Sequence, residues 1–197
     1  MYAENKTSTT KNFFINIILN EKHSKKTKLM ILAFDTHYFD NKAKTIAVSF
    51  NDWQDEEPLH IYSEIIEGVA DYEPGSFYKR ELPCIVSLLQ QINIEEIDAI
   101  VIDGYTTLEE NKLGLGGHLY EKIDRKIPII GVAKSQYQSN TSNYKALLRG
   151  ESIRPLYISA IGISLEEAYI HIKMMHGNFR MPTLLQLVDT KTKERNN

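Results

Sequence analysis

The sequence predicts a mixed α/β fold, in which helices flank a mixed β-sheet. Three observations lead to this prediction. Apolar runs of strand length occur at residues 30–34, 99–102 and 127–133, and such runs are typical of strands covered on both faces. Short segments with polar turns follow the first run and indicate an antiparallel meander. Apolar residues at helical spacing then separate the later runs.

Length and composition indicate one domain. The chain has 197 residues, of which 42% are hydrophobic, enough for one well-formed core. The single cysteine, Cys84, excludes an intramolecular disulfide, and no Cys/His cluster has zinc-like spacing. No segment reaches transmembrane length. Lysines follow the apolar run at 13–19, which Asn16 interrupts, so this run is unlike a signal peptide and we expect a cytoplasmic protein.

Charge is distributed unevenly along the chain. Residues 1–29 carry six lysines and two glutamates, a formal charge of +4; the whole chain carries −3, which leaves −7 for residues 30–197. The first segment is polar and lacks sustained periodicity, so we predict a mobile extension at 1–29 and one domain at 30–197. An acidic body argues against a general nucleic-acid binder, which normally has a basic face.

The domain is expected to begin with three strands, at 30–35, 44–50 and 59–66, with a turn at 36–42. The later elements are a strand ending at 103, a helix at 113–122, a strand at 127–134, a polar loop at 135–145, a strand at 154–160, a helix at 164–175 and a terminal helix from 182.

Between these two halves, apolar residues at helical spacing predict a helix that begins near Ser76 and is kinked by Pro83. Glu81 lies on its apolar stripe. An inward carboxylate requires a compensating charge. Glu81 therefore either pairs with Arg80 or Lys79 or takes part in a metal site.

Two predicted core strands end in a carboxylate, Asp35 and Asp103. An unpaired carboxylate at the end of a buried strand costs several kcal/mol unless a cation or donors meet it. Two such ends suggest one shared charge, and we interpret it as a divalent metal site. Lys134 ends a third strand, where it either holds a phosphate or orients a water, or is a solvated surface lysine.

The element order fits a ribonuclease H-like architecture, and short motifs make the resemblance more specific. Seven segments, in order, resemble motifs of the endonuclease V family: Phe34-Asp35-Thr36-His37-Tyr38-Phe39, Tyr72-Glu73-Pro74-Gly75, Arg80-Glu81-Leu82-Pro83, Ile102-Asp103-Gly104, Gly114-Leu115-Gly116-Gly117-His118-Leu119, Gly131-Val132-Ala133-Lys134-Ser135 and Arg180-Met181-Pro182. The resemblance covers roughly residues 31–190.

The resemblance implies a metal-dependent endonuclease. The family hydrolyses the second phosphodiester on the 3′ side of a deoxyinosine or inosine nucleotide. Asp35 and Asp103 would bind Mg²⁺, for which Mn²⁺ would substitute, and Glu81 would complete the site directly or through water. Lys134 would contact the scissile phosphate or the attacking water.

The same resemblance implies a binding surface for inosine-containing DNA or RNA. Tyr72, Pro74 and Gly75 match the wedge that fills the stack when the base is turned out, at a cost of a few kcal/mol. The segment with Gly116, Gly117 and His118 would allow backbone groups to read the base edge. We further expect a monomer with no membrane partner.

Two segments depart from the family pattern. Where the family carries a histidine and arginines after its Asp-Gly, this chain has residues 105–112, with Glu109 and Asn111 at those positions. A later Gly-His-Arg is replaced within residues 159–164. Three hypotheses therefore remain: an inosine-directed endonuclease, a related nuclease with another substrate, and a non-catalytic binding module that retains the fold.

Overall fold

The computed structural model describes residues 29–68, 77–109, 112–137 and 143–194. Residues 1–28 of the predicted extension lie outside the described residues. In chain order the elements are β1 (Met30–Phe39), β2 (Lys42–Phe50), β3 (His60–Glu67), α2 (Phe77–Leu89), the 3-10 helix η1 (Ile94–Glu96), β4 (Ile97–Asp103), β5 (Thr107–Glu109), β6 (Lys112–Leu113), α3 (Leu115–Lys122), β7 (Ile129–Ala133), β8 (Lys145–Leu147), β9 (Leu156–Ile161), α4 (Leu165–Met174) and α5 (Thr183–Lys193).

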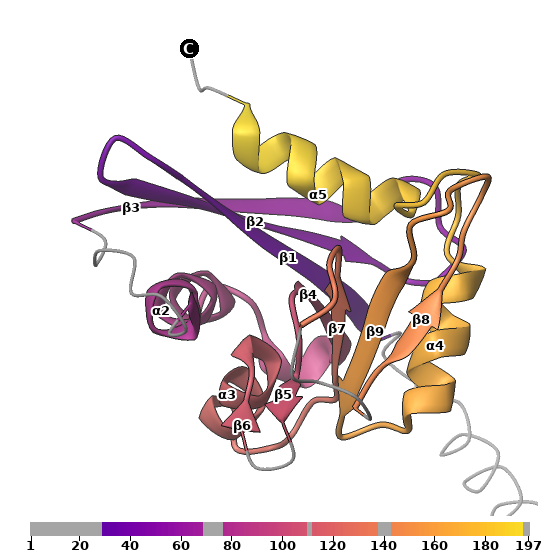
Figure 1. Cartoon of the computed structure of the whole chain (residues 1–197). Helices are drawn as coiled ribbons and strands as arrows, with labels where there is room; N and C mark the ends of the chain where they lie inside the picture. Colours follow the sequence, from indigo (N-terminus) through magenta and orange to yellow (C-terminus); the bar gives the residue numbers. More distant parts are fainter. Residues whose placement is uncertain (1–28, 69–76, 110–111, 138–142, 195–197) are drawn as a thin grey trace, which may run out of the picture.

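Seven strands form one mixed sheet in the order β3-β2-β1-β4-β7-β9-β8 (Figure 1). The central strands β1, β4 and β7 run parallel, and the remaining pairs are antiparallel. The sequence-based prediction of a mixed sheet is confirmed. Parallel neighbours bring their carboxyl ends to the same edge, and this edge is where a site can form.

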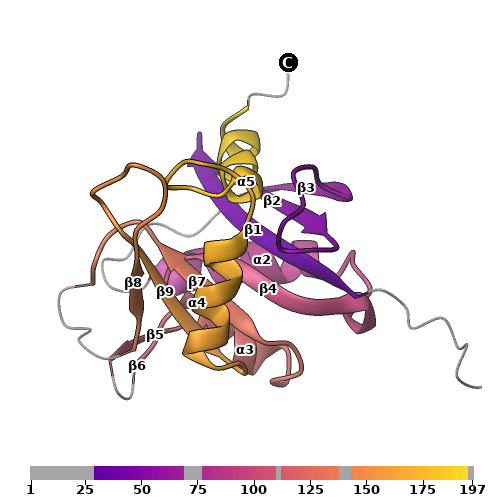
Figure 2. The ribbon, with the colours of Figure 1, turned by 90° about the vertical axis from the view of Figure 1, so that its right-hand side faces the viewer.

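Helices cover both faces of the sheet, α4 and α5 one face and α2 and α3 the other (Figures 1 and 2). Alternation along β1 divides its side chains between two cores. Ile31 and Ala33 pack in the core that includes Val188 of α5, whereas Leu32 and Phe34 pack with Ile85 of α2 and their neighbours. The strands are therefore buried on both faces, as their apolar runs predict.

The turn predicted at 36–42 is wrong. β1 continues to Phe39 and pairs with Lys42 at the start of β2, so the turn is confined to Asp40 and Asn41. Both residues have positive φ, 43° and 58°. Asp and Asn tolerate this left-handed conformation better than most residues, which explains how a two-residue hairpin forms without glycine.

The main helices are found where they were predicted, and Pro83 lies within α2 without ending it. Ser164 caps α4, since its hydroxyl accepts a hydrogen bond from the Glu167 amide at 3.1 Å. The short strands β5, β6 and β8 and the helix η1 were not predicted. No helix in the described ranges is both long and apolar enough to cross a membrane.

Candidate active site

Asp35 and Asp103 lie on adjacent parallel strands at the same edge of the sheet. Phe34 pairs with Ile102 in the β1–β4 register, so each carboxylate follows directly on a paired, buried residue. The Asp35 carboxylate accepts a hydrogen bond from the Thr192 hydroxyl of α5 at 3.2 Å. Asp35 therefore lies within β1 and not at its end as predicted, whereas Asp103 is the last residue of β4, and the parallel register brings the two residues to neighbouring positions.

Lys134 follows β7 and joins two carboxylates. Its ammonium donates to Asp103 Oδ2 at 2.7 Å and to Asp189 Oδ1 at 3.0 Å. Lys193 donates to the other oxygen of Asp189 at 2.6 Å. Lys134 is thus part of an ion-pair network at the sheet edge, and the alternative of an isolated, solvated lysine does not describe it.

Asp189 was missed by the sequence reasoning. It lies on α5, one residue after buried Val188 and four after buried Leu185. A carboxylate beside the apolar stripe of a terminal helix is the signal that could have found it. That segment also carries Lys191 and Lys193 and resembles a solvated charged tail.

Glu81 is buried, with only 2% of its surface exposed. Burial raises its pKa well above the ordinary value, and the charges of Asp35 and Asp103 raise it further, while Lys134 lowers it. Glu81 is therefore within electrostatic influence of these carboxylates, although it comes from α2. The alternative pairing with Arg80 is not observed, since that guanidinium lies over the Tyr38 ring at 3.7 Å.

The other charges of the cluster respond to their neighbours in opposite directions. Burial raises the pKa of Asp35, and Asp103 and Asp189 add to the effect against the opposing charge of Lys134. Burial alone would raise the pKa of Asp189, but hydrogen bonds from Lys193 and Lys134 hold it below the ordinary value. The pKa of Lys134 is raised by Asp103 and Asp189, which outweigh its burial.

The donor set suits a hard divalent cation. Four acidic side chains, Asp35, Glu81, Asp103 and Asp189, are opposed by only two ammonium groups, those of Lys134 and Lys193. Carboxylate oxygens are the ligands that Mg²⁺ prefers. The described residues contain no group of three or more acidic, His or Cys side chains already placed to hold a metal.

A cavity of about 510 Å³ adjoins this cluster. Asp103 and Lys134 line one side, and the aromatic rings of Tyr78, Tyr105 and Tyr137 are among the other lining groups. The Tyr105 hydroxyl donates to the carbonyl of Ser135 at 2.9 Å. A cavity with aromatic side chains and two reactive groups at its edge is suited to a planar, hydrogen-bonding ligand.

The glycines of the predicted base-reading segment lie behind this cavity. Gly116 and Gly117 are buried, and their amides donate to the carbonyls of Tyr105 and Thr106 at 3.1 and 3.0 Å. A Cβ on Gly117 would approach the Thr106 carbonyl to 2.5 Å. The two glycines therefore permit close packing of α3, and their amides are not available to a base.

His118 lies beside the cavity, and its ring stacks on Tyr78 with centroids 3.7 Å apart. Burial lowers the pKa of His118. The predicted wedge residues Tyr72, Pro74 and Gly75 lie outside the described residues. Their role stays a prediction.

Comparisons with known proteins support the fold and the family resemblance. The family model described as Endonuclease V matches residues 14–190. The curated endonuclease V of Alkalilimnicola ehrlichii is 27% identical over 133 residues, which are 58% of this chain and 57% of that protein. This chain thus aligns with little more than half the length of that relative.

Solved structures share the architecture at low sequence identity. The endonuclease V of Ciona intestinalis, in complex with a 24mer DNA containing an inosine followed by a ribo-adenosine, has a TM-score of 0.71 and 16% identity over 91% of this chain and 97% of that chain. The catalytic domain of human endonuclease V has a TM-score of 0.69 and 19% identity over 96% of each chain. The predicted ribonuclease H-like fold is confirmed.

Proposed function

Because this chain belongs to the endonuclease V family, we propose that it is a divalent-metal-dependent endonuclease for inosine-containing nucleic acid. It would hydrolyse the second phosphodiester on the 3′ side of a deoxyinosine or inosine nucleotide. The observation that carries the proposal is the meeting of Asp35, Glu81, Asp103 and Lys134 beside a cavity that can receive a base.

Asp35 and Asp103 would hold Mg²⁺, with Glu81 and Asp189 completing the acidic environment. The metal supplies polarisation of the phosphoryl oxygen and lowers the pKa of water. Glu81 enters the cluster at a cost, because its burial and two like charges oppose ionisation. A divalent cation would remove that cost, which supports a metal at this position.

To contact a phosphate, the Lys134 ammonium would have to give up one of its present carboxylate partners. In the described structure its ammonium is held by Asp103 and Asp189. With Asp103 among the residues that would hold the metal, the Lys134 ammonium would keep Asp189 as a partner and could donate to the phosphate that undergoes hydrolysis. A lysine positioned beside the reacting group stabilises negative charge that develops on the phosphoryl oxygens.

The turned-out base would occupy the 510 Å³ cavity, between the reactive edge and the tyrosine side chains. Extruding a base costs a few kcal/mol, which stacking on aromatic side chains partly recovers. The Tyr78–His118 pair would brace one wall. Within this site Gly116 and Gly117 shape the wall from behind, and Tyr72, Pro74 and Gly75 would act as the wedge.

A second function is favoured by one observation. The segment expected to supply basic side chains instead folds into the small β5–β6 sheet, which carries Glu109. An acidic residue there would weaken contacts to a phosphate backbone. This feature favours a related nuclease with a different substrate.

A cleavage assay separates these functions. Wild-type protein with Mg²⁺ or Mn²⁺ is incubated with strands that carry inosine or adenine at one position, in deoxyribose and ribose forms. Cutting of inosine strands alone, at the second phosphodiester on the 3′ side, is the expected result. Cutting that ignores inosine indicates the related nuclease. No cutting, together with no Mg²⁺ binding by calorimetry, contradicts both and favours the binding module.

A further inference from the structure

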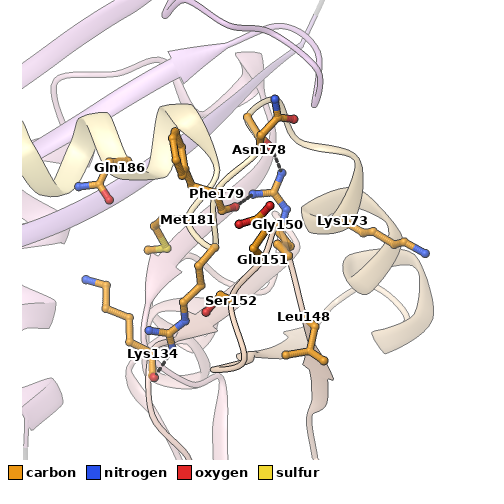
Figure 3. A pocket seen from close by; sticks show the side chains of 13 residues that line it. Lys134, Leu148, Gly150, Glu151, Ser152, Lys173, Asn178, Phe179, Met181 and Gln186 are labelled. Carbon is orange, nitrogen blue, oxygen red and sulfur yellow. Dashed lines mark hydrogen bonds between the residues drawn. The ribbon is translucent and has the colours of Figure 1, made fainter.

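A large groove of about 1190 Å³ has Lys134 in its lining, and its other lining residues differ from those of the base cavity (Figure 3). Its walls come from the loop after β8, residues 148–152, and from the segment between α4 and α5, residues 177–181. We call it the exit groove. Its size exceeds what the cleavage of a single phosphodiester requires.

The two walls are fastened to each other. The Arg149 guanidinium donates to the carbonyls of Met175, Gly177 and Phe179, which closes the segment after α4 onto the loop after β8. Gly150 has a φ of +57°, and a Cβ there would overlap the Asn178 carbonyl. Specific contacts between the two walls therefore hold the exit groove in shape.

The charge of the exit groove is opposite to that of the protein. Four cationic side chains and a single carboxylate, Glu151, line it, whereas the whole chain carries a formal charge of −3. The cations are Lys134, Arg149, Lys173 and Arg180. Figure 3 shows Lys134 and Lys173 on opposite sides of the lining residues, so cationic side chains lie at both sides of the groove.

Phe179 adds an apolar platform. It is 80% exposed although it is a large aromatic residue, and it lines the groove as part of the wall formed by residues 177–181. Leu148, 62% exposed, lines it as well. Positive side chains combined with an exposed aromatic ring are typical of surfaces that bind single-stranded nucleic acid, where the cations follow the backbone and a base stacks on the ring.

The exit groove meets the proposed active site at one shared residue. Lys134 lines both the groove and the base cavity. Arg180 fixes this junction, since its guanidinium donates to the carbonyls of Lys134 and Pro155. A strand with its turned-out base in the cavity would thus pass Asp103 and Lys134 and reach the groove next.

We propose that the exit groove binds the nucleotides on the 3′ side of the cut as a single strand, with one base stacked on Phe179. The direction rests on the proposed function, because the inosine occupies the cavity and the cut lies 3′ to it. Phe179 would then be a positioning residue that holds the strand beyond the scissile phosphate.

The test compares two inosine strands, one ending a single nucleotide after the cut and one extended by several nucleotides. Wild-type protein should bind and cut the extended strand more efficiently. The Phe179→Ala variant should lose about five- to thirtyfold in affinity for the extended strand. Its preference for the extended over the short strand should shrink accordingly. The matched control is Ile153→Ala, which removes a 92% exposed apolar side chain that does not line the groove.

A fluorescent adenine analogue placed at successive positions 3′ of the cut locates the stacked base. Quenching at one position that disappears in Phe179→Ala supports the proposal. An unchanged preference for the extended strand in Phe179→Ala overturns it. If wild-type protein cuts no inosine strand, the proposed function fails separately. In that case the affinity for the extended strand tests the proposed binding in the groove. Equal affinity of wild type and Phe179→Ala rejects this binding, and a loss of affinity in Phe179→Ala but not in Ile153→Ala supports it.

Discussion

Glu81 occupies a position where burial and neighbouring carboxylates disfavour its charged form. It is almost fully buried, and Asp35 and Asp103 oppose its ionisation. In a protein selected for stability alone, an apolar residue would serve better at this position. Under the proposed function, the carboxylate is kept for the chemistry of the site.

The raised pKa of Glu81 predicts that the free energy of unfolding of the metal-free protein depends on pH. The pKa of Glu81 is raised above 4.5 on folding, so the folded state binds its proton more tightly than the unfolded state. Stability should therefore fall as pH rises from about 4.5 toward the raised pKa. Asp35 contributes with the same sign from 3.8 upward. The variant Glu81→Gln should reduce this slope and gain roughly 1–3 kcal/mol at alkaline pH.

Denaturant unfolding from pH 5 to 9 in the presence of a chelator measures the effect. The control is Glu57→Gln, which removes an exposed carboxylate and should leave the slope unchanged. A slope as steep in Glu81→Gln as in wild type would show that this carboxylate is not the buried acid described.

Asp103 should be indispensable for cutting and unimportant for folding. The variant Asp103→Asn is expected to lower the cutting rate at least about a hundredfold, because a neutral amide is a weak ligand for a hard cation. The side chain is 33% exposed and Lys134 keeps Asp189 as a partner, so the melting temperature should change little.

Single-turnover cutting and circular dichroism test this variant. Asp98→Asn, an exposed carboxylate on the same strand, should cut normally. Near-normal turnover by Asp103→Asn would rule out the proposed metal ligand.

The residues of the site differ in how visible they are in the sequence. Asp35, Asp103 and Lys134 end apolar runs, and a charge at the end of a buried strand is conspicuous because burial is costly. Asp189 is not conspicuous, since its helix also carries surface lysines. Its role depends on the packing of α5 against β1 and β2, which brings residues 35 and 189 together. Local sequence does not encode such a long-range contact.

At the scale of elements, long strands and helices follow from their patterns, whereas short strands do not. β7 is a continuous apolar run, and β4 contains one at residues 99–102. β5, β6 and β8 contain two or three residues each and exist because a partner strand lies beside them. Two or three residues carry too little periodicity to distinguish a strand from a loop. Whether such a segment forms a strand therefore depends on its pairing partner, and hence on the tertiary structure.

Gly131 lies in the middle of β7 and packs closely against the loop that follows Asp103. A Cβ at this position would lie 2.4 Å from the Gly104 carbonyl and 2.5 Å from the Ser159 hydroxyl. That hydroxyl accepts the Thr106 amide at 3.0 Å. We expect Gly131→Ala to cost about 1–3 kcal/mol through overpacking. It should also displace the loop beside Asp103 and lower the cutting rate.

Gly68→Ala is the comparison for Gly131→Ala, because Gly68 has a φ of +69° but open space around its missing Cβ. This control should lose stability through backbone strain while its cutting rate is retained. Thermal unfolding and cutting are measured on both variants. Equal cutting by both would show that the loop does not depend on the close approach at Gly131.

At the scale of the whole molecule, charge separates the groove from the rest of the surface. Residues 30–197 carry a formal charge of −7, which would repel a phosphate backbone at long range. The lysines and arginines of the exit groove are the local exception. Strand binding should therefore depend on a few placed cations, and it should be weaker and more localised than in a generally basic protein.

Salt dependence measures how many phosphates the groove contacts. If about three phosphates meet its cations, the logarithm of strand affinity should fall with the logarithm of salt concentration with a slope of about −2. Lys173→Gln, which removes a cation from the lining of the groove, should make this slope less steep by about 0.7. Lys122→Gln removes an exposed lysine at the end of α3 and should leave it unchanged. Fluorescence anisotropy at constant pH and fixed Mg²⁺ gives the slope. A slope near zero, or an equal change in both variants, would mean that the strand follows another surface, because release of counterions is the unavoidable consequence of phosphate neutralisation.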